Sequence, residues 1–122
     1  MSKVSSFFIG RLKGCGYALK GALMLLKTEP SIQVQAVIAI IMTALGFCLD
    51  INATEWILQT FAIGLVMSIE GLNTSVEAIA DFVHPDFHDK IGFIKDIAAG
   101  AVFIAAITAI VVGCIIYVPY LF

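Results

Sequence analysis

Charged residues are scarce in this chain. Only 13% of its 122 residues are Asp, Glu, Lys or Arg, whereas 61% are hydrophobic, and the mean hydropathy is +1.03. A water-soluble domain of this size needs more charge to cover its surface. The composition therefore excludes an ordinary soluble domain and indicates a small integral membrane protein, with residues 1–122 forming one domain.

A basic surplus and a cysteine framework are also missing. The net charge is −2, so the chain lacks the basic surface that nucleic-acid binding needs. Cys15, Cys48 and Cys114 are far apart and form no CxxC motif, so we interpret them as small apolar packing residues. The N-terminus shows no compact apolar core with a small-residue cleavage site, and we expect no cleavable signal peptide.

What the chain does contain is three long apolar segments. Residues 30–49 carry no charge, over about the length that crosses a bilayer. The second apolar run, 56–69, is too short to cross, so we expect its helix to continue through polar residues to position 80. The third span covers 97–118, and Pro119 is expected to end that helix. The sequence thus predicts an all-α membrane protein with three transmembrane helices.

The N-terminal segment, 1–28, combines basic and apolar residues. Lys13, Lys20 and Lys27 recur every seven residues and would share one face of a helix. Such a helix is expected to lie on the membrane surface with its lysines toward anionic headgroups. All seven Lys and Arg residues lie in this segment or in residues 82–96. The positive-inside rule therefore predicts a cytoplasmic N-terminus.

A polar stripe crosses the end of the second span. Glu70, Asn73, Glu77 and Asp81 fall within about 80° of one another on a helix. If Trp56 marks the outer interface, Glu70 lies roughly 21 Å inward and Glu77 roughly 31 Å inward, at the cytoplasmic edge of the hydrocarbon core. Ionisable residues within a membrane are costly, so this stripe indicates a functional site.

Two different roles are expected within the stripe. Glu70 and Glu77 are about 10 Å apart along a helix, too far to chelate one ion together. The deeper carboxylate suits proton acceptance, and the one at the surface suits a hard divalent cation. Glu29, at the entrance to the first span, could complete the metal shell, and Lys95 and Asp96 enter the third span at the same depth.

Simpler interpretations stay open on the residues alone. Glu70 could form hydrogen bonds that help three helices choose their register. Glu77 and Asp81 could be a solvated helix end, and Asn73 could join two helices.

The polar loop after the stripe contains His84 and His88, four residues apart. Pro85 lies between them, which argues against a helical zinc pair. The loop could touch a polar cofactor or be simply solvated. No GxxxxGK[ST] phosphate loop occurs, so a nucleotide would have to be bound by another route.

Together, these residues resemble the small prokaryotic membrane lipid kinases, the diacylglycerol kinase and undecaprenol kinase family. The strongest part is the pattern E-x-x-N-[ST]-[AS]-x-E-x-x-x-D, which begins at Glu70 and ends at Asp81. The resemblance covers nearly the whole chain. Its other matching parts are Phe87-His88, Lys95-Asp96, residues 98–102, residues 16–21 and Glu29.

The resemblance implies a homotrimer with sites shared between subunits, and transfer of the ATP γ-phosphoryl group to a lipid hydroxyl. By motif position, Glu70 is the general base beside the lipid substrate, and Glu29 and Glu77 hold Mg²⁺ with the ATP phosphates. The other implied contacts are, to the nucleotide, Tyr17, Asp86, His88, Lys95 and Asp96, and, to the lipid headgroup, Asn73 and Ala99.

Some positions depart from the family pattern. Gly10 stands where the diacylglycerol branch often has Arg, and Gly71 replaces a larger apolar residue, which would add helix flexibility beside Glu70. Ser31, Gln33 and Gln35 replace more strongly polar residues near the expected lipid entry. The choice of acceptor is therefore open, with diacylglycerol slightly favoured over undecaprenol.

The expected function is an ATP- and Mg²⁺-dependent lipid kinase of the bacterial cytoplasmic membrane that converts diacylglycerol to phosphatidic acid. A proton-coupled transporter with Glu70 as its relay is an alternative from another class. It needs a water path from both sides, whereas the stripe opens only toward the cytoplasm. A catalytically idle assembly subunit is a third, and it would tolerate Glu70→Gln and Glu77→Gln.

Overall fold

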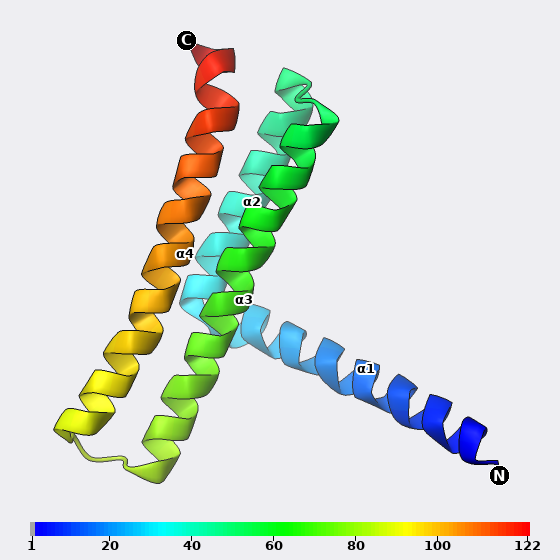
Figure 1. The fold of residues 1–122 in the computed structure, drawn as a ribbon, viewed down its shortest axis with the longest axis vertical. Coiled ribbons are helices and arrows are strands. Elements are labelled where there is room, and N and C mark those ends of the chain that lie inside the picture. The colour runs from blue at the N-terminus through cyan, green and yellow to red at the C-terminus, as the bar shows by residue number, and fades with distance from the viewer. Residues whose placement is uncertain (1) are drawn as a thin grey trace.

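The computed structural model describes residues 2–122 and contains four helices in succession: α1 (Lys3–Thr28), α2 (Pro30–Leu49), α3 (Ala53–Val83) and α4 (Asp89–Leu121). Figure 1 shows α2, α3 and α4 side by side, while α1 leaves the bundle at an angle. The three bundled helices are each long and apolar enough to cross a membrane. The prediction of an all-α chain with three candidate spans and a separate N-terminal helix is confirmed.

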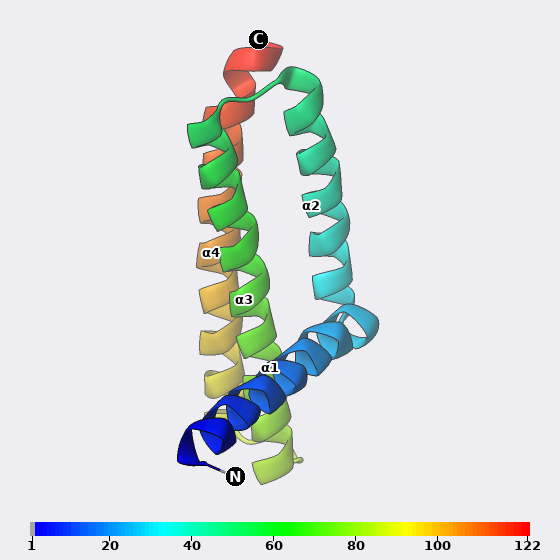
Figure 2. The same cartoon turned by 90° about the vertical axis from the view of Figure 1, so that its right-hand side faces the viewer.

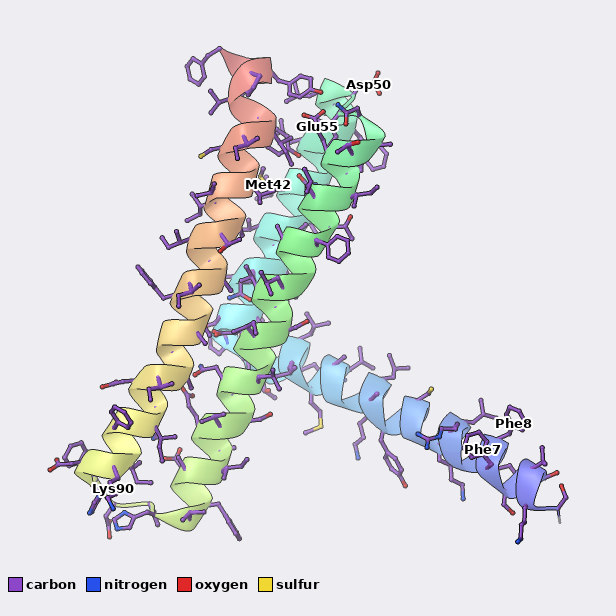
Figure 3. All side chains as sticks on the ribbon, in the orientation of Figure 1. Phe7, Phe8, Met42, Asp50, Glu55 and Lys90 are labelled. Carbon is purple, nitrogen blue, oxygen red and sulfur yellow. The ribbon has the colours of Figure 1, made fainter. Side chains whose placement is uncertain are left out.

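Most of helix α1 is left uncovered by the rest of the chain that the structure describes. None of its residues is buried, and Phe7 and Phe8 are more than half exposed. Figure 3 shows both rings near the free end of α1, far from the bundle. Apolar side chains in this position need a membrane surface or another protein to cover them.

The turn between α2 and α3 is tightly specified. Asp50 adopts a left-handed conformation, with φ of 51°, and so ends α2. Asn52 then begins α3 through a capping box, in which its side chain accepts from the Glu55 amide over 2.9 Å and Glu55 accepts from the Asn52 amide over 3.0 Å. This turn lies at the end of the bundle opposite to Lys90 (Figure 3).

The core gathers at this same end. Ile51, Ile116 and Tyr117 are buried against one another. The Trp56 ring lies against Gly46, where an added Cβ would come within 2.7 Å of the indole. The three helices are therefore locked together near the α2–α3 turn and the C-terminus.

Near the middle of α3, a second close approach fixes the position of the end of α1. A Cβ on Gly71 would lie 3.0 Å from Leu25 Cδ1, so the last turn of α1 reaches α3 at this residue. Residues 72–83 of α3 continue about 18 Å further, and Figure 2 shows α3 and α4 extending past the junction. Glu70, the residue before Gly71, is thus level with the junction between α1 and α2.

Two expectations at the helix ends are wrong. Pro119 does not end α4, which runs to Leu121. A proline in the last turn removes only one donor, and the Phe122 amide still bonds to the Val118 carbonyl over 3.0 Å. The loop expected at 82–96 is also shorter, because α3 reaches Val83 and α4 begins at Asp89 rather than at 97. Charged residues end an apolar run without ending a helix that has emerged into water.

Candidate active site

The deepest residue of the site is Glu70, whose side chain is turned into the bundle. It is only 7% exposed, whereas other faces of α3 expose large apolar side chains. The four buried residues of α3 are Gln59, Val66, Glu70 and Ala80, and they fall within about 80° of one another around the helix. This face is the one that α2 and α4 cover, so Glu70 does not face acyl chains.

One turn further along α3, Asn73 and Glu77 form a pair. Asn73 Nδ2 donates to Glu77 Oε1 over 3.3 Å, and Glu77 is half-buried. Asn73 Oδ1 is buried and has no hydrogen-bond partner. A buried acceptor without a partner is rare in folded proteins. The pair therefore offers a carboxylate held by a hydrogen bond and an amide oxygen without a partner, and oxygen ligands of both kinds are preferred by hard divalent cations.

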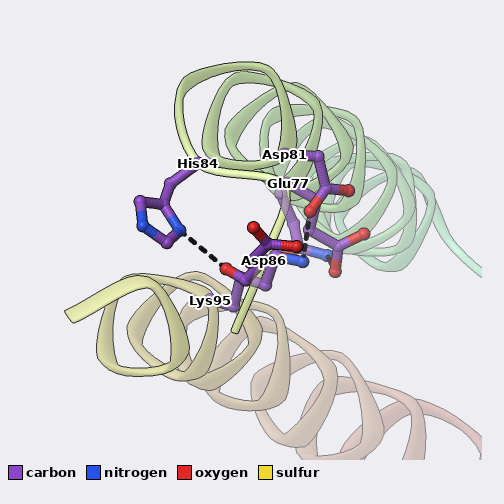
Figure 4. Close-up of polar contacts among 6 residues, drawn as sticks. Glu77, Asp81, His84, Asp86 and Lys95 are labelled. Carbon is purple, nitrogen blue, oxygen red and sulfur yellow. Dashed lines mark hydrogen bonds and ion pairs between the residues drawn. The ribbon is translucent and has the colours of Figure 1, made fainter. Parts of the chain in front are cut away.

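Asp81 and Lys95 connect the emerging ends of α3 and α4. Lys95 Nζ lies 2.6 Å from Asp81 Oδ1 (Figure 4). Both side chains are exposed, at 37% and 60%, so the ion pair contributes at most about 1 kcal/mol. Lys95 can therefore exchange this carboxylate for the phosphate of a ligand at little cost.

The loop between α3 and α4 is ordered by its histidines. His84 Nδ1 donates to the Asp86 carbonyl over 2.7 Å (Figure 4), and His88 Nδ1 accepts from the Lys90 amide over 3.0 Å. His88 thereby caps α4. Because Nδ1 of His88 accepts, the proton of its neutral ring is on Nε2. That N–H is available to an anionic ligand, and the Asp86 side chain in the same loop is exposed.

Other predicted residues are not joined to this stripe. Tyr17 is 74% exposed on α1, which projects away from the ends of α3 and α4 (Figure 1). Glu29 is half-buried at the α1–α2 junction, where its backbone N–H bonds to the Leu25 carbonyl. Within residues 2–122, no hydrogen bond or ion pair links either side chain to the stripe, and no three His, Cys, Asp or Glu residues form a metal-binding group.

Asp96 and Ala99 are exposed on α4, beyond Lys95. The Asp96 carboxylate makes no hydrogen bond within the described residues. A single chain thus brings together Glu70, Asn73 and Glu77 on α3 and pairs Lys95 with Asp81. The remaining predicted residues are not joined to this group.

One polar group deeper in the bundle has no counterpart among the expectations from the sequence. The Tyr117 hydroxyl donates to Gln59 Oε1, and Gln59 Nε2 donates to the Met42 carbonyl over 3.2 Å. Gln59 and Tyr117 are 6% and 5% exposed. A signal was available, because Gln59 lies eleven residues before Glu70, which is three helical turns along the same face.

Comparison with known proteins gives one matching family and several similar proteins. The family described as prokaryotic diacylglycerol kinase matches residues 16–117. The diacylglycerol kinase of Escherichia coli K12 is 29% identical over 116 residues, which are 95% of each chain. The undecaprenol kinase of Bacillus subtilis 168 is 33% identical over 95 residues, 78% of this chain and 77% of that one. The diacylglycerol kinase of Haemophilus influenzae is 34% identical over 102 residues, 83% and 86% of the two chains.

The family match extends over most of the chain and includes every part of the polar stripe. The three helices that are long and apolar enough to cross a membrane agree with a family of membrane proteins. The chain belongs to the prokaryotic diacylglycerol kinase family, and it is a multi-pass lipid kinase of the bacterial inner membrane.

Proposed function

We propose that this chain transfers the γ-phosphoryl group of ATP to the hydroxyl of diacylglycerol and forms phosphatidic acid. The observation that carries the proposal is the burial of Glu70 on α3, level with the α1–α2 junction, with Asn73 and Glu77 following on the same face of α3. A lipid hydroxyl in the membrane and a nucleotide in water can meet along such a stripe. The names of two of the relatives support the same acceptor.

In this proposal, Glu70 is the general base. The lipid hydroxyl oxygen attacks the γ-phosphorus, its proton passes to the Glu70 carboxylate, and the bond from phosphorus to the ADP oxygen breaks. Phosphoryl transfer asks little covalent chemistry of a protein and depends on alignment and charge stabilisation. A carboxylate held away from water by α2 and α4 is placed to accept that proton without competition from solvent.

Glu77 and Glu29 are the proposed Mg²⁺ ligands. The partner-free Asn73 Oδ1 and the half-buried Glu77 carboxylate suit an oxygen-liganded cation. When bound, Mg²⁺ would neutralise charge on the ATP phosphates. Asn73 orients the Glu77 carboxylate and, with Ala99, lies on the side proposed for the lipid headgroup.

The nucleotide is proposed to bind at the emerging ends of α3 and α4. Lys95 would leave Asp81 and pair with a phosphate, and His88 would donate from Nε2. The remaining proposed nucleotide contacts are Tyr17, Asp86 and Asp96. Tyr17 and Glu29 would reach this site across the interfaces of a homotrimer, since within residues 2–122 of one chain no hydrogen bond joins them to the stripe.

Undecaprenol is a second candidate acceptor. One relative that is 33% identical carries the name undecaprenol kinase. Ser31, Gln33 and Gln35 depart from the family pattern at the membrane entrance of α2, where an acceptor would be distinguished.

The test is ATP consumption by the purified protein in detergent, with diacylglycerol, undecaprenol or no acceptor in parallel, and with lipid products separated by chromatography. We expect phosphatidic acid to be the main product. Preferred phosphorylation of undecaprenol would replace the acceptor. Absence of any phosphorylated lipid in all three reactions would contradict the kinase function and favour the alternative of proton-coupled transport through Glu70.

A further inference from the structure

A cavity of about 260 Å³ lies between α2, α3 and α4, on the side of Glu70 away from the water-exposed ends. From α3 it is lined by Gln59, Ala62, Ile63, Val66 and Met67, which continue toward Glu70 one turn beyond. Val66 lines the cavity and lies one helical turn before Glu70 on the buried face of α3, so the cavity and the Glu70 carboxylate lie along the same face of that helix.

At its end farthest from Glu70 the cavity is lined by Gln59 and Met42, and the Tyr117 hydroxyl bonds to both behind them; these three residues form a polar floor. Their hydrogen bonds hold α2, α3 and α4 together at one level. Gln59 and Met42 both line the cavity. A buried hydrogen-bonded group of this kind is costly to disrupt, so the floor is firm compared with the aliphatic walls above it.

The walls between the floor and Glu70 are almost wholly apolar. Gln35 is the exception: it lines the cavity from α2, five residues after that helix begins, and its Oε1 is buried without a partner. The end of the cavity nearest Glu70 therefore offers one hydrogen-bond acceptor, and the rest of the lining is hydrocarbon. An amphiphile with a hydroxyl at one end and an aliphatic chain matches this lining.

The depth of the cavity also suits one lipid tail. Eleven residues separate Gln59 from Glu70, which is about 16 Å along α3. One leaflet is half of a hydrocarbon core about 30 Å thick, or about 15 Å. A lipid tail of about this length therefore spans the distance from a hydroxyl at Glu70 to the floor.

Building on the proposed kinase reaction, we infer that this cavity holds one acyl chain of the acceptor and that the Gln59–Tyr117 floor sets the longest chain that fits. Gln59 and Tyr117 are then specificity residues located three helical turns from the chemistry. A chain longer than the cavity must bend out between helices, which raises KM or misplaces the hydroxyl at Glu70. A long polyprenol would be disfavoured for the same reason.

Gly113 provides the sharpest test. It lines the cavity at the centre of the α4 face, and nothing lies within 4 Å of the position that its Cβ would take. Gly113→Leu therefore fills the cavity without a clash in the backbone. Gly64 on α3 has equally open surroundings but does not line this cavity, so Gly64→Leu is the matched control.

The measurement is kcat/KM for dioctanoylglycerol and dioleoylglycerol in the same mixed micelles. We expect Gly113→Leu to lower the value for dioleoylglycerol about tenfold or more while that for dioctanoylglycerol changes less than about threefold. Gly64→Leu should leave the ratio of the two values unchanged. Gln59→Ala opens the floor and should raise the ratio in favour of the longer acceptor; if this variant does not fold, Gly113→Leu still decides.

Equal ratios in Gly113→Leu and Gly64→Leu would overturn the inference and leave the kinase function intact. A loss that is the same for both chain lengths and is accompanied by a changed oligomeric state would also overturn it, because a helix of a second copy would then fill the cavity. Failure of the unmodified protein to phosphorylate either diacylglycerol would instead contradict the proposed function.

Discussion

Asn73 donates a hydrogen bond to Glu77 across one turn of α3, over 3.3 Å, and its own Oδ1 remains buried without a partner. The amide therefore fixes the orientation of the carboxylate and keeps an acceptor in reserve. The two residues lie between the buried Glu70 and the exposed ion pair of Asp81 with Lys95. Along one helix face, the environment changes from enclosed to aqueous, as a reaction between a lipid and a nucleotide requires.

Glu77→Gln should weaken the binding of Mg²⁺ with ATP, because an amide is a neutral and poorer ligand than a carboxylate. We expect the Mg²⁺ concentration for half-maximal activity to rise about tenfold or more. Glu55→Gln is the control, since Glu55 is a carboxylate at the opposite end of the bundle. A Mg²⁺ titration that is the same for Glu77→Gln and the unmodified protein would refute the metal role.

Lys95→Met and Asp81→Asn both break the same ion pair but should have different consequences. If Lys95 contacts phosphate, Lys95→Met raises KM for ATP about tenfold or more, because a charge-assisted contact is lost. Asp81→Asn should change stability by at most about 1 kcal/mol and leave KM for ATP within about threefold. Equal effects of the two substitutions would mean that the pair is purely structural. Steady-state kinetics and thermal unfolding in detergent supply the two readouts.

Substitution of Gly71 should act through α1. Gly71→Ala places a methyl group 3.0 Å from Leu25 Cδ1, the flexible end of a side chain that can turn aside, so we expect nearly normal activity. Gly71→Ile would push the end of α1 away beside Glu70, and a displacement of about 1 Å can lower kcat about a hundredfold.

Leu25→Ala in the same chain should recover much of the activity lost in Gly71→Ile, since it removes the opposing side chain. Measurement of kcat for the two single variants and the double variant completes the cycle. Additive losses would show that Gly71 acts on Glu70 through α3 alone and not through α1.

Gly46→Ala should destabilise the bundle without affecting the chemistry. The new Cβ would lie 2.7 Å from the Trp56 ring, and overpacking of this kind costs about 1–3 kcal/mol. Gly64→Ala is the control, because its Cβ meets open space and alanine favours a helix by about 1 kcal/mol. Unfolding in detergent should move in opposite directions for the two variants. An unchanged midpoint for Gly46→Ala would show that the indole can move away freely.

Much of the architecture could be predicted because apolar runs reveal spanning helices. The first run, 30–49, contains no charge and corresponds to α2. The helix ends could not be predicted in the same way. The third apolar run begins at 97, yet α4 begins at Asp89, because His88 caps a helix turn that lies in water. Hydropathy reports where a chain meets lipid, while hydrogen bonding decides where a helix ends.

The stripe from Glu70 to Asp81 could be found from helical periodicity, and the structure shows that Glu70, its first residue, is buried within the bundle. The role of Gly71 could not be predicted. The sequence suggests helix flexibility, but α3 is continuous at this residue, and the missing side chain makes room for Leu25 of α1. That contact joins residues far apart in sequence. Helical periodicity places Gln59 on the face of Glu70, but its hydrogen bond with Tyr117 could not be predicted for the same reason, since it joins α3 to α4.

The most direct test of the account is the Glu70→Gln variant, measured for transfer of phosphate from ATP to diacylglycerol and, on the same preparation, for equilibrium ATP binding. If Glu70 accepts the proton of the lipid hydroxyl, transfer falls by a factor of about a hundred to ten thousand while ATP binding is retained. Normal transfer by Glu70→Gln would contradict the assignment of the base and with it the proposed mechanism.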